Sequence, residues 1–528
     1  MTASIQVTPN TLQRWFSPWQ NRAIRTVLLL GLAARLLLAL ILPPGYDEAY
    51  YQFYGLNPGL SYFDHPAAVG LWSWISAHLG GSLLAIRLPC LISYTVALTW
   101  MSGATERWFG SRAALTAVAL GSLSPLLFAC GGLLLLPDSP LLLTIAALMR
   151  WLADQPQPLP VRARDGVVLG LILGLMTLGK YHALLIMVGL LACSLTRSSS
   201  RRAWRTPWPW LTGLVWLLIS SPLWLWNHEH HWVSFLFQGA RTTAQPGFHL
   251  EGSLLFLLTQ ILLVFPSIAL PLGLGLMPRQ RPDRKIADRQ LLRWLALPQL
   301  LVFLILAGRM QVLSCWLVPC WFLLLPLAGD WCALHEQGAW GRRQRLSTWI
   351  TTAVLAPLLL LVALQVRWGV ADRLLPPGVD TSAELMSPEA LRRALRSDPG
   401  LWQALQQADV IASLRYEMPG FLALALDRSQ RNRLTTFSGD PRGFAFWDPR
   451  DRYQGLSGLV YRIRPVAAPG TAAMPADPWP EALGPLTAVG TVRVQRGSRQ
   501  TMELEFMRFG PLSAPWTRPY GPSTLATH

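Results

Sequence analysis

The chain begins with a long apolar segment. Between Ala23 and Leu42 the only charged residues are Arg25 and Arg35, and a helix of about 20 apolar residues is long enough to cross the hydrocarbon core of a bilayer. Hydropathy predicts further spans after it. We therefore expect a polytopic α-helical membrane protein of about 11 spans, at approximately 23–42, 85–102, 112–131, 138–152, 166–179, 181–196, 208–226, 253–276, 291–307, 314–333 and 347–366.

The composition agrees with a membrane protein. Hydrophobic residues make up 52% of the 528 residues and charged residues 14%, whereas a soluble domain carries about 25% charged residues. The formal net charge of +17 does not indicate a nucleic-acid partner, because the basic residues form short runs between apolar segments. Such runs are typical of the cytoplasmic loops of membrane proteins.

The distribution of these basic runs predicts the orientation of the chain. Loops on the side of the N-terminus carry 21 arginines and lysines, and loops on the other side carry four before residue 367. The positive-inside rule therefore places the tail of residues 1–22 in the cytoplasm. Because an odd number of spans puts the C-terminal region outside, we expect a multi-pass protein of the inner (plasma) membrane with residues 367–528 extracytoplasmic.

Two regions of the chain differ in character. Residues 23–366 are predicted to form a transmembrane domain with helices in its external loops, at 43–84 and 227–252. From residue 367 to residue 528 the pattern is that of a small external α/β domain. Its expected helices are 387–395 and 401–407, and its expected strands are 410–413, 433–437, 459–464, 491–495 and 502–506. The last two strands read as a hairpin, because a turn with Gly497 separates them.

Two adjacent carboxylates, Asp47 and Glu48, follow the first apolar segment. Pro43 and Pro44 end the helix there, so we expect the pair at the external membrane surface. One carboxylate can take a proton from an acceptor while its neighbour orients a helix, a metal or a second substrate. We predict a catalytic role for both, with Asp47 as a ligand if a divalent metal ion is bound. The alternative is that both only cap the helix expected to start at Ala49.

A second external cluster, Ser61 to Pro66, contains Asp64 and His65. Either side chain can bind a phosphate or a metal. The alternative is a structural hydrogen bond between the two side chains that fixes the turn before Pro66.

Lys180 is unusual because only two of the 45 basic residues, Lys180 and Lys285, are lysines. It lies between two short apolar segments on the predicted external side. A lone cation at membrane depth indicates a functional site, and a compact ammonium group suits a phosphate oxygen. The alternative is that Lys180 extends along apolar surface to reach water.

Other polar residues of the external loops are possible substrate-binding residues. His228 and His231 flank Glu229 at a helical spacing, but the pattern fixes no further metal ligand. A cofactor is therefore not indicated with certainty, although a divalent metal ion is possible. The possible substrate-binding residues are Asp64, Asp138, Tyr181, His182, His228 and Arg309.

These motifs together resemble a known family. Asp-Glu-Ala-Tyr-Tyr at 47–51 and Ser-Tyr-Phe-Asp-His-Pro at 61–66 look like the first external loop of the protein-O-mannosyltransferase-like bacterial glycosyltransferases. These enzymes belong to the C-type integral-membrane class, which includes the aminoarabinose transferases. The resemblance covers about residues 20–330 and continues through the motifs at 86–89, 137–140, 179–183 and 226–232.

The resemblance implies a C-type glycosyltransferase architecture and a sugar donor linked to polyprenyl phosphate. It implies transfer on the extracytoplasmic face to a lipid, polysaccharide or protein acceptor, with inversion of the anomeric centre. By similarity, Asp47 is the catalytic carboxylate that deprotonates or orients the acceptor, and Glu48 supports it or lines the acceptor site. The same similarity places His65 and Lys180 at the donor phosphate. The chain departs from its relatives at Ala67, where proline is common, and at 308–315, where an Asn-Trp-Pro-like motif is frequent.

Three other functions are compatible with the sequence. A transporter or flippase for polyprenyl-linked sugars shares the external polar residues, although transporters place polar groups near the bilayer midplane in repeated halves. A glycan polymerase or ligase of similar architecture differs in the length of the donor glycan. A structural membrane scaffold, with the C-terminal domain as a receptor, is the third.

Overall fold

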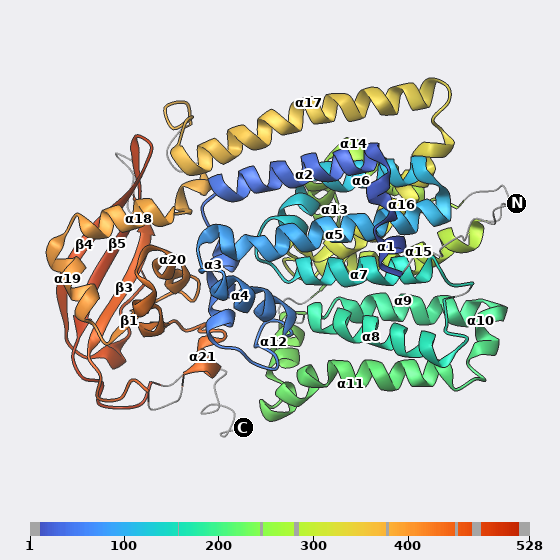
Figure 1. Ribbon diagram of the computed structural model, residues 1–528. Helices are drawn as coiled ribbons and strands as arrows, with labels where there is room; N and C mark the ends of the chain where they lie inside the picture. Colours follow the sequence, from blue (N-terminus) through green and yellow to red (C-terminus); the bar gives the residue numbers. More distant parts are fainter. Residues whose placement is uncertain are drawn as a thin grey trace, which may run out of the picture.

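The computed structural model describes residues 11–156, 158–242, 247–278, 285–375, 380–448, 452–466 and 477–516. Its larger part is a bundle of roughly aligned helices, and its smaller part is a sheet domain at one end of this bundle (Figure 1). The long helix α17 connects the two parts.

Eleven helical regions of the bundle coincide with the predicted spans. By length and apolarity, six of the described helices can cross a membrane, or seven if one bent pair counts as a single span. The multi-pass prediction is confirmed, while the number of 11 stays a prediction. The helices of the bundle are α2 (Arg22–Ile41), α5 (Leu83–Phe109), α6 (Ser111–Leu123), α7 (Asp138–Leu152), α8 (Ala163–Gly179), α9 (Ala183–Thr196), α11 (Trp208–Glu229), α13 (Leu250–Val264), α14 (Pro266–Leu276), α15 (Ile286–Ala307), α16 (Val318–Leu334) and α17 (Ala339–Trp368).

Shorter helical pieces connect these helices. They are α1 (Thr11–Trp15), η1 (Ser17–Gln20), η2 (Leu127–Gly131), α10 (Ser198–Ala203), α12 (Val233–Thr242) and η3 (Ser314–Leu317).

The burial of the helices agrees with a lipid environment. In the segment Ser314–Leu334, which includes α16, 83% of the most apolar stretch is buried inside the protein, but in α2 and α17 only 28% is. Leucines such as Leu30 and Leu40 on the outer face of α2 are exposed, whereas Leu28 on its inner face is fully buried. In water such exposed apolar faces are unfavourable, but in a bilayer they face hydrocarbon.

The first external loop folds into two helices, α3 (Tyr46–Leu56) and α4 (Ala68–His78), which pack against each other. The predicted helix start at Ala49 is wrong by three residues, since α3 begins at Tyr46 with Gly45 as its extended N-cap. Asp47 and Glu48 therefore lie in the first turn of α3.

The C-terminal domain is built on a five-stranded mixed sheet with the order β2-β1-β3-β5-β4. The strands β2, β1 and β3 are parallel, and β3, β5 and β4 are antiparallel. The predicted hairpin is present as β4 and β5, which are longer than expected and turn at Gly497 with φ +55°. The strands are β1 (Val410–Ser413), β2 (Leu434–Thr436), β3 (Gly458–Pro465), β4 (Leu486–Arg496) and β5 (Arg499–Phe509).

Short helices complete this domain (Figure 1). They are α18 (Pro388–Arg396), α19 (Pro399–Gln407), α20 (Met418–Ala425) and α21 (Phe444–Trp447), with the 3-10 turns η4 (Thr381–Glu384), η5 (Arg428–Arg433) and η6 (Glu481–Leu483).

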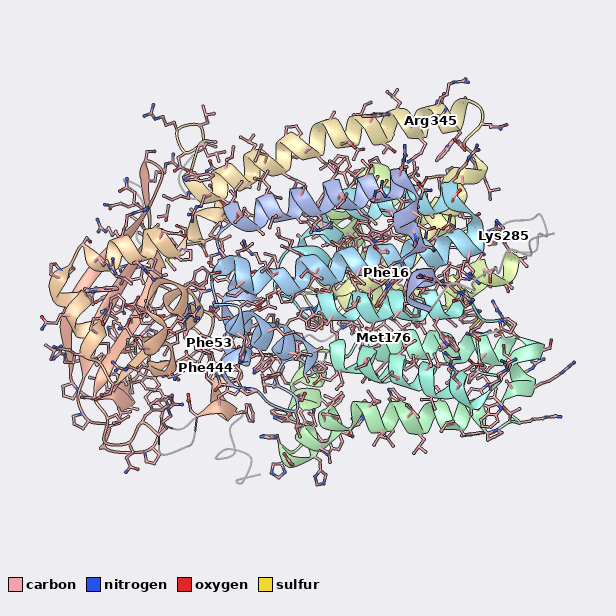
Figure 2. The ribbon with its side chains drawn as sticks, viewed as in Figure 1. Phe16, Phe53, Met176, Lys285, Arg345 and Phe444 are labelled. Atoms are coloured by element: carbon pink, nitrogen blue, oxygen red, sulfur yellow. The ribbon has the colours of Figure 1, made fainter. Side chains whose placement is uncertain are left out.

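The C-terminal domain and the first external loop share one apolar core. Helix α20 packs on α3, and Gln52 Nε2 donates to the carbonyl oxygen of Gly420 at 2.8 Å. Phe53 of α3 and Phe444 of α21 lie against each other with ring centroids 5.1 Å apart (Figure 2). The position of α3 is therefore fixed from both sides, by the bundle and by the C-terminal domain.

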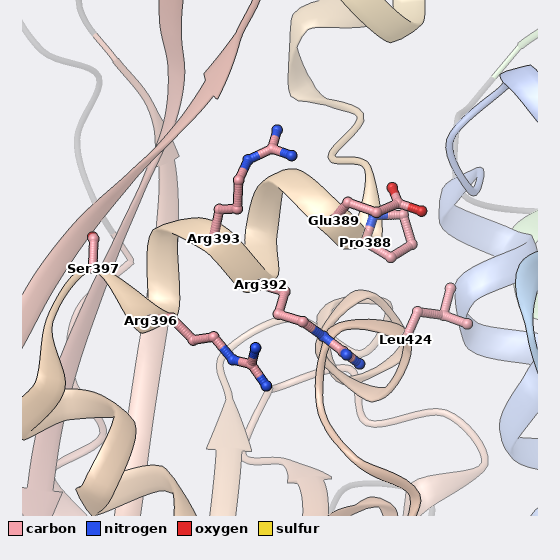
Figure 3. Close-up of a pocket in the computed structure, with 7 residues that line it drawn as sticks. All are labelled: Pro388, Glu389, Arg392, Arg393, Arg396, Ser397 and Leu424. Carbon is pink, nitrogen blue, oxygen red and sulfur yellow. The ribbon is translucent and has the colours of Figure 1, made fainter.

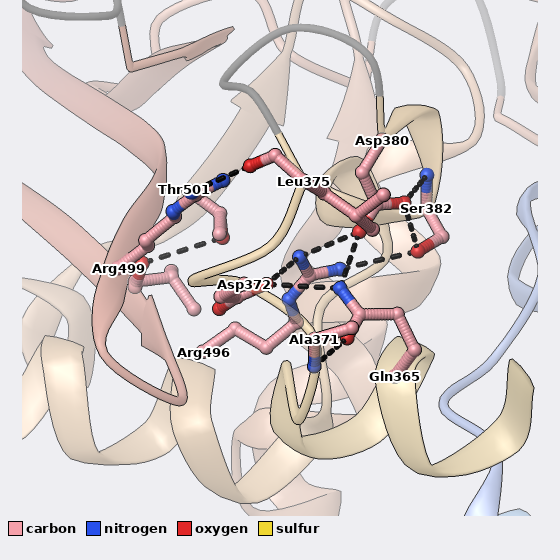
Figure 4. Close-up of polar contacts among 10 residues, drawn as sticks. Gln365, Ala371, Asp372, Leu375, Asp380, Ser382, Arg496, Arg499 and Thr501 are labelled. Atoms are coloured by element: carbon pink, nitrogen blue, oxygen red, sulfur yellow. Dashed lines mark hydrogen bonds and ion pairs between the residues drawn. The ribbon is translucent and has the colours of Figure 1, made fainter. Parts of the chain in front are cut away.

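A buried ionic cluster joins the β4–β5 hairpin to the end of α17 (Figure 4). Arg496 Nη2 donates to Asp372 Oδ1 at 2.7 Å and to Asp380 Oδ2 at 2.8 Å. Gln365, on the last turn of α17, donates to the same two carboxylates. Burial, which opposes ionisation, is outweighed by the hydrogen bonds from Ser382, Gln365 and Arg496, so the pKa of Asp380 is lowered to about 2.

Candidate active site

Asp47 lies in the first turn of α3, partly exposed, where α3 meets the C-terminal domain. Burial raises the pKa of its carboxyl group above the ordinary value, and the negative charge of Asp64 raises it further. The positive charges of Arg442 and Lys180 oppose this shift. A carboxylate whose pKa is raised is a stronger base, which suits a group that accepts a proton.

Glu48, its neighbour, is buried and forms an ion pair with Arg87 of α5. Arg87 Nε and Nη2 donate to the two carboxylate oxygens at 2.9 and 2.6 Å. The backbone N–H groups of Gly45 and Leu135 donate to the same carboxylate, each at 3.3 Å. Both oxygens of Glu48 are thus used in holding the first turn of α3.

Arg87 also donates hydrogen bonds to carbonyl groups at the C-terminal end of α2. The last carbonyl groups of a helix have no partner within it, and Pro43 prevents the chain from continuing as a helix. Arg87 Nη1 donates to the carbonyl oxygens of Ala39 and Leu42, and Nη2 donates to that of Pro43. One arginine therefore fixes the end of the first span relative to Glu48, and hence places Asp47.

Asp64 is buried and receives three hydrogen bonds. Tyr50 Oη and Tyr54 Oη, from successive turns of α3, donate to its Oδ2 at 2.8 and 3.1 Å. Arg442 Nη1, from the C-terminal domain, donates to its Oδ1 at 2.7 Å. The N–H group of Gly443 in turn donates to Tyr50 Oη at 2.8 Å.

His65, the next residue, is held by α3 as well. Its Nε2 atom is 2.8 Å from Tyr51 Oη, and the two share a hydrogen bond. Burial and, after it, the negative charge of Asp47 raise the pKa of the Tyr51 hydroxyl group.

Lys180 and Asp138 form a buried ion pair at the predicted external end of two helices. Lys180 follows the last residue of α8, and Asp138 is the first residue of α7. The Nζ atom is 2.9 Å from both carboxylate oxygens. Lys180 is only 3% exposed, so the alternative that it extends to water is wrong.

The remaining predicted site residues fall into two groups. Tyr181 and His182 follow Lys180, with the Tyr181 ring against Phe235 and the His182 ring stacked on Phe303 at 4.8 Å. His228 and Arg309 have exposed side chains, one at the end of α11 and the other just after α15. The substrate-binding roles of all four stay predictions.

The described residues contain no group of three or more His, Cys, Asp and Glu side chains arranged to hold a metal ion. The possible divalent metal ion at Asp47 therefore stays a prediction.

The sequence did not reveal the contribution of Arg442, in the C-terminal domain, to the candidate site. This residue has a left-handed backbone with φ +50°, and its guanidinium carbon lies 4.6 Å from the centroid of the Tyr416 ring. Its Nε donates to Asp440 at 2.9 Å. The turn residues around Arg442 are a signal for a loop, but nothing local indicates its partner Asp64, which lies 378 residues earlier.

Part of the chain matches a known protein family. Residues 64–226 match the family model of the dolichyl-phosphate-mannose-protein mannosyltransferases. Among curated protein sequences, none matches the chain.

The solved structures similar to this one include ArnT from Cupriavidus metallidurans, both bound to undecaprenyl phosphate and in the apo state. The bound form has a TM-score of 0.60 at 16% identity, and the apo form 0.58 at 15%; each comparison covers 91% of this chain and 97% of the other. The oligosaccharyltransferase AglB from Archaeoglobus fulgidus has a TM-score of 0.44 at 11% identity, covering 79% of this chain and 64% of that chain.

The chain thus has an ArnT-like fold, with a small C-terminal sheet domain. The match to the mannosyltransferase family model, taken with this fold, indicates that the protein is a glycosyltransferase. The expectation drawn from the sequence motifs is confirmed at this level.

Proposed function

We propose that this protein transfers a sugar from a polyprenyl-phosphate donor to an acceptor of the cell envelope, on the extracytoplasmic face of the inner membrane. The observation that carries the proposal is the position of Asp47, a partly exposed carboxylate under the influence of the cations Arg442 and Lys180. The undecaprenyl phosphate bound by the structurally similar ArnT supports a donor of this lipid class.

In this mechanism Asp47 is the general base. Its carboxylate takes the proton of an acceptor hydroxyl or amine while the acceptor atom attacks the anomeric carbon of the sugar. The bond between that carbon and the phosphate oxygen breaks, and the lipid phosphate leaves with the electron pair. A single displacement of this kind inverts the anomeric centre. Product with retained configuration, measured by NMR of the anomeric proton, would contradict the mechanism.

The departing phosphate requires positive charge, for which we assign His65 and Lys180. Lys180 is already paired with Asp138, so the pair as a whole is neutral until a phosphate competes for the ammonium group. Arg442, paired with Asp64, adds a further cation on the same side of α3. Base catalysis contributes about 10²- to 10⁴-fold to the rate, and fixed cations stabilise the developing phosphate charge.

The other predicted residues have supporting roles in this proposal. Glu48 is a positioning residue, because Arg87 and two backbone N–H groups occupy its carboxylate. Asp64 and Asp138 hold the cations, and Tyr181 and His182 line the site next to Lys180. His228 and Arg309 are assigned to the exposed part of the substrate-binding surface.

The proposal is tested by mass spectrometry of envelope glycolipids and glycans. The strains are a deletion, the deletion with the intact gene, and the deletion with Asp47→Asn at equal membrane abundance. We expect one sugar-sized mass to disappear in the deletion and to return only with the intact gene. Asp165→Asn is a matched control, since Asp165 also lies in the first turn of a helix, α8, but on the predicted cytoplasmic side. Full restoration by Asp47→Asn would refute the role of Asp47.

A further inference from the structure

A groove runs along α18 on the C-terminal domain, away from the candidate active site. Its outer part is a cavity of about 660 Å³ (Figure 3), lined by Pro388, Glu389, Arg392, Arg393, Arg396, Ser397 and Leu424. An adjoining cavity of about 300 Å³ shares four of these residues and continues to Gly80–Leu83, Asp427, Arg428 and Arg431. We call the two cavities together the α18 groove.

The α18 groove carries an excess of positive charge. Five arginines line it, against the two carboxylates of Glu389 and Asp427. Glu389 is already paired with Arg367, Nη1 to Oε2, at 2.9 Å. The side chain of Asp427 faces its own helical turn, where it caps η5.

The sequence of α18 explains why its arginines face outward. Leu391, Ala394 and Leu395 are buried against the sheet domain, so the arginines between and after them lie toward the exposed side of the helix. Two guanidinium groups are held in place there. Arg392 Nε donates to the carbonyl oxygen of Ala425 at 2.6 Å, and Arg396 lies over the Trp402 ring at 4.9 Å. Arg393 is exposed.

The inner part of the groove is built jointly with the membrane domain. Arg428 donates to the carbonyl oxygen of Gly80, and Arg431 Nη2 donates to that of Gly81 at 3.3 Å. Both glycines have positive φ, +112° and +58°, so a side chain there would be strained and would also meet these arginines. This loop directly precedes α5, a membrane-spanning helix. The groove therefore extends from the C-terminal domain to the membrane surface.

We infer that the α18 groove binds the phosphate group of a lipid in the outer leaflet. Arginine presents a planar fork of donors that matches phosphate oxygens, and cations near a membrane surface attract anionic headgroups. A groove that ends at the start of a span is placed to receive a headgroup whose acyl chains stay in the bilayer. This site goes beyond the proposed transfer reaction, which involves only the cluster around Asp47.

Native mass spectrometry of the full chain in detergent tests the inference. The probes are dioleoylphosphatidylglycerol and dioleoylphosphatidylcholine, titrated separately. The triple variant Arg392→Gln/Arg393→Gln/Arg396→Gln is expected to bind phosphatidylglycerol roughly 10- to 100-fold more weakly than the unmodified chain. The control Arg342→Gln/Arg343→Gln/Arg345→Gln makes the same charge change at the other end of the bundle, next to the start of α17, and is expected to bind like the unmodified chain.

Two further comparisons keep the test decisive. The single variant Arg393→Gln changes an exposed side chain only, so it reports on binding even if the triple variant does not fold. Competition with glycerol 1-phosphate or glucosamine 1-phosphate separates the two sources of the phosphate. Stronger displacement by the first supports a bulk phospholipid, and by the second a phosphorylated glycolipid. Equal phosphatidylglycerol binding by the unmodified chain and the Arg393→Gln or triple variant would overturn the inference.

Discussion

At the scale of single residues, the proposed mechanism depends on how the surroundings of Asp47 set its proton affinity. Burial and the charge of Asp64 raise the pKa of Asp47 above the ordinary 3.8. Only the deprotonated carboxylate can act as a base, and that form is lost as the pH falls through the raised pKa. We therefore expect the acid limb of kcat/KM to have its midpoint above pH 3.8. A pH–rate profile measures it, and a midpoint at or below that value would contradict the prediction.

Arg442 has an effect of opposite sign. Its charge lowers the pKa of Asp47 and neutralises Asp64. We expect Arg442→Gln to move the acid limb to higher pH and to reduce kcat/KM roughly 10- to 100-fold, as the loss of a charged hydrogen bond does. Arg442→Lys, which keeps the charge, is expected to leave the acid limb close to its original position. An unchanged acid limb in Arg442→Gln would assign Arg442 a purely structural role.

The sequence predicts some of these residues and not others for a physical reason. Asp47 and Lys180 are conspicuous because charge is rare beside apolar segments. The residues that pair with the charged groups of the site are distant in the chain. Glu48 is paired with Arg87, 39 residues later, and Asp64 is paired with Arg442 of the C-terminal domain, 378 residues later. Neither pairing leaves a local pattern, so sequence alone predicted a shared catalytic role for two carboxylates that have different surroundings.

At the scale of elements, the Arg87–Glu48 pair fixes α3 to the ends of α2 and α5. Both side chains are buried, 0% and 1% exposed, and removal of one partner leaves an uncompensated buried charge. We expect Arg87→Ala to destabilise the protein by about 3–5 kcal/mol, measured as a lower Tm in detergent. The exposed pair Arg112–Glu336 offers the control, because Arg112→Ala should cost about 0–1 kcal/mol. Similar losses in both variants would show that the Arg87 pair has no special role.

The elements themselves were largely predictable. Long apolar segments and the β4–β5 hairpin follow from periodicity and turn residues. The span predicted over 253–276 is wrong in shape, since α13 and α14 meet at an angle of 115°. The bend lies at Phe265, with φ +85°, next to Pro266. Proline disfavours a helical conformation in the residue before it, whereas hydropathy records only that the segment is apolar.

At the scale of the whole molecule, the C-terminal domain and the membrane bundle act as one unit. Their common core places α20 against α3, and the cluster around Arg496 fastens the hairpin to the last span. Arg442 lies on the C-terminal domain but contacts Asp64 in the first external loop. The candidate site is therefore complete only when the domain is docked, which a sequence read segment by segment does not reveal.

Gly420 is the position where this docking is tightest. A Cβ atom there would lie 1.9 Å from the carbonyl oxygen of Ala49 in α3, so Gly420→Ala must push α20 away from α3. Because Arg442 would leave Asp64 with the domain, we expect a loss of transfer activity together with faster cleavage between the two parts in limited proteolysis. Gly439→Ala is the matched control, since a Cβ atom there meets nothing within 4 Å. If Gly420→Ala kept full activity while proteolysis showed an undocked domain, the site would not need the C-terminal domain, and the role assigned to Arg442 would fall with it.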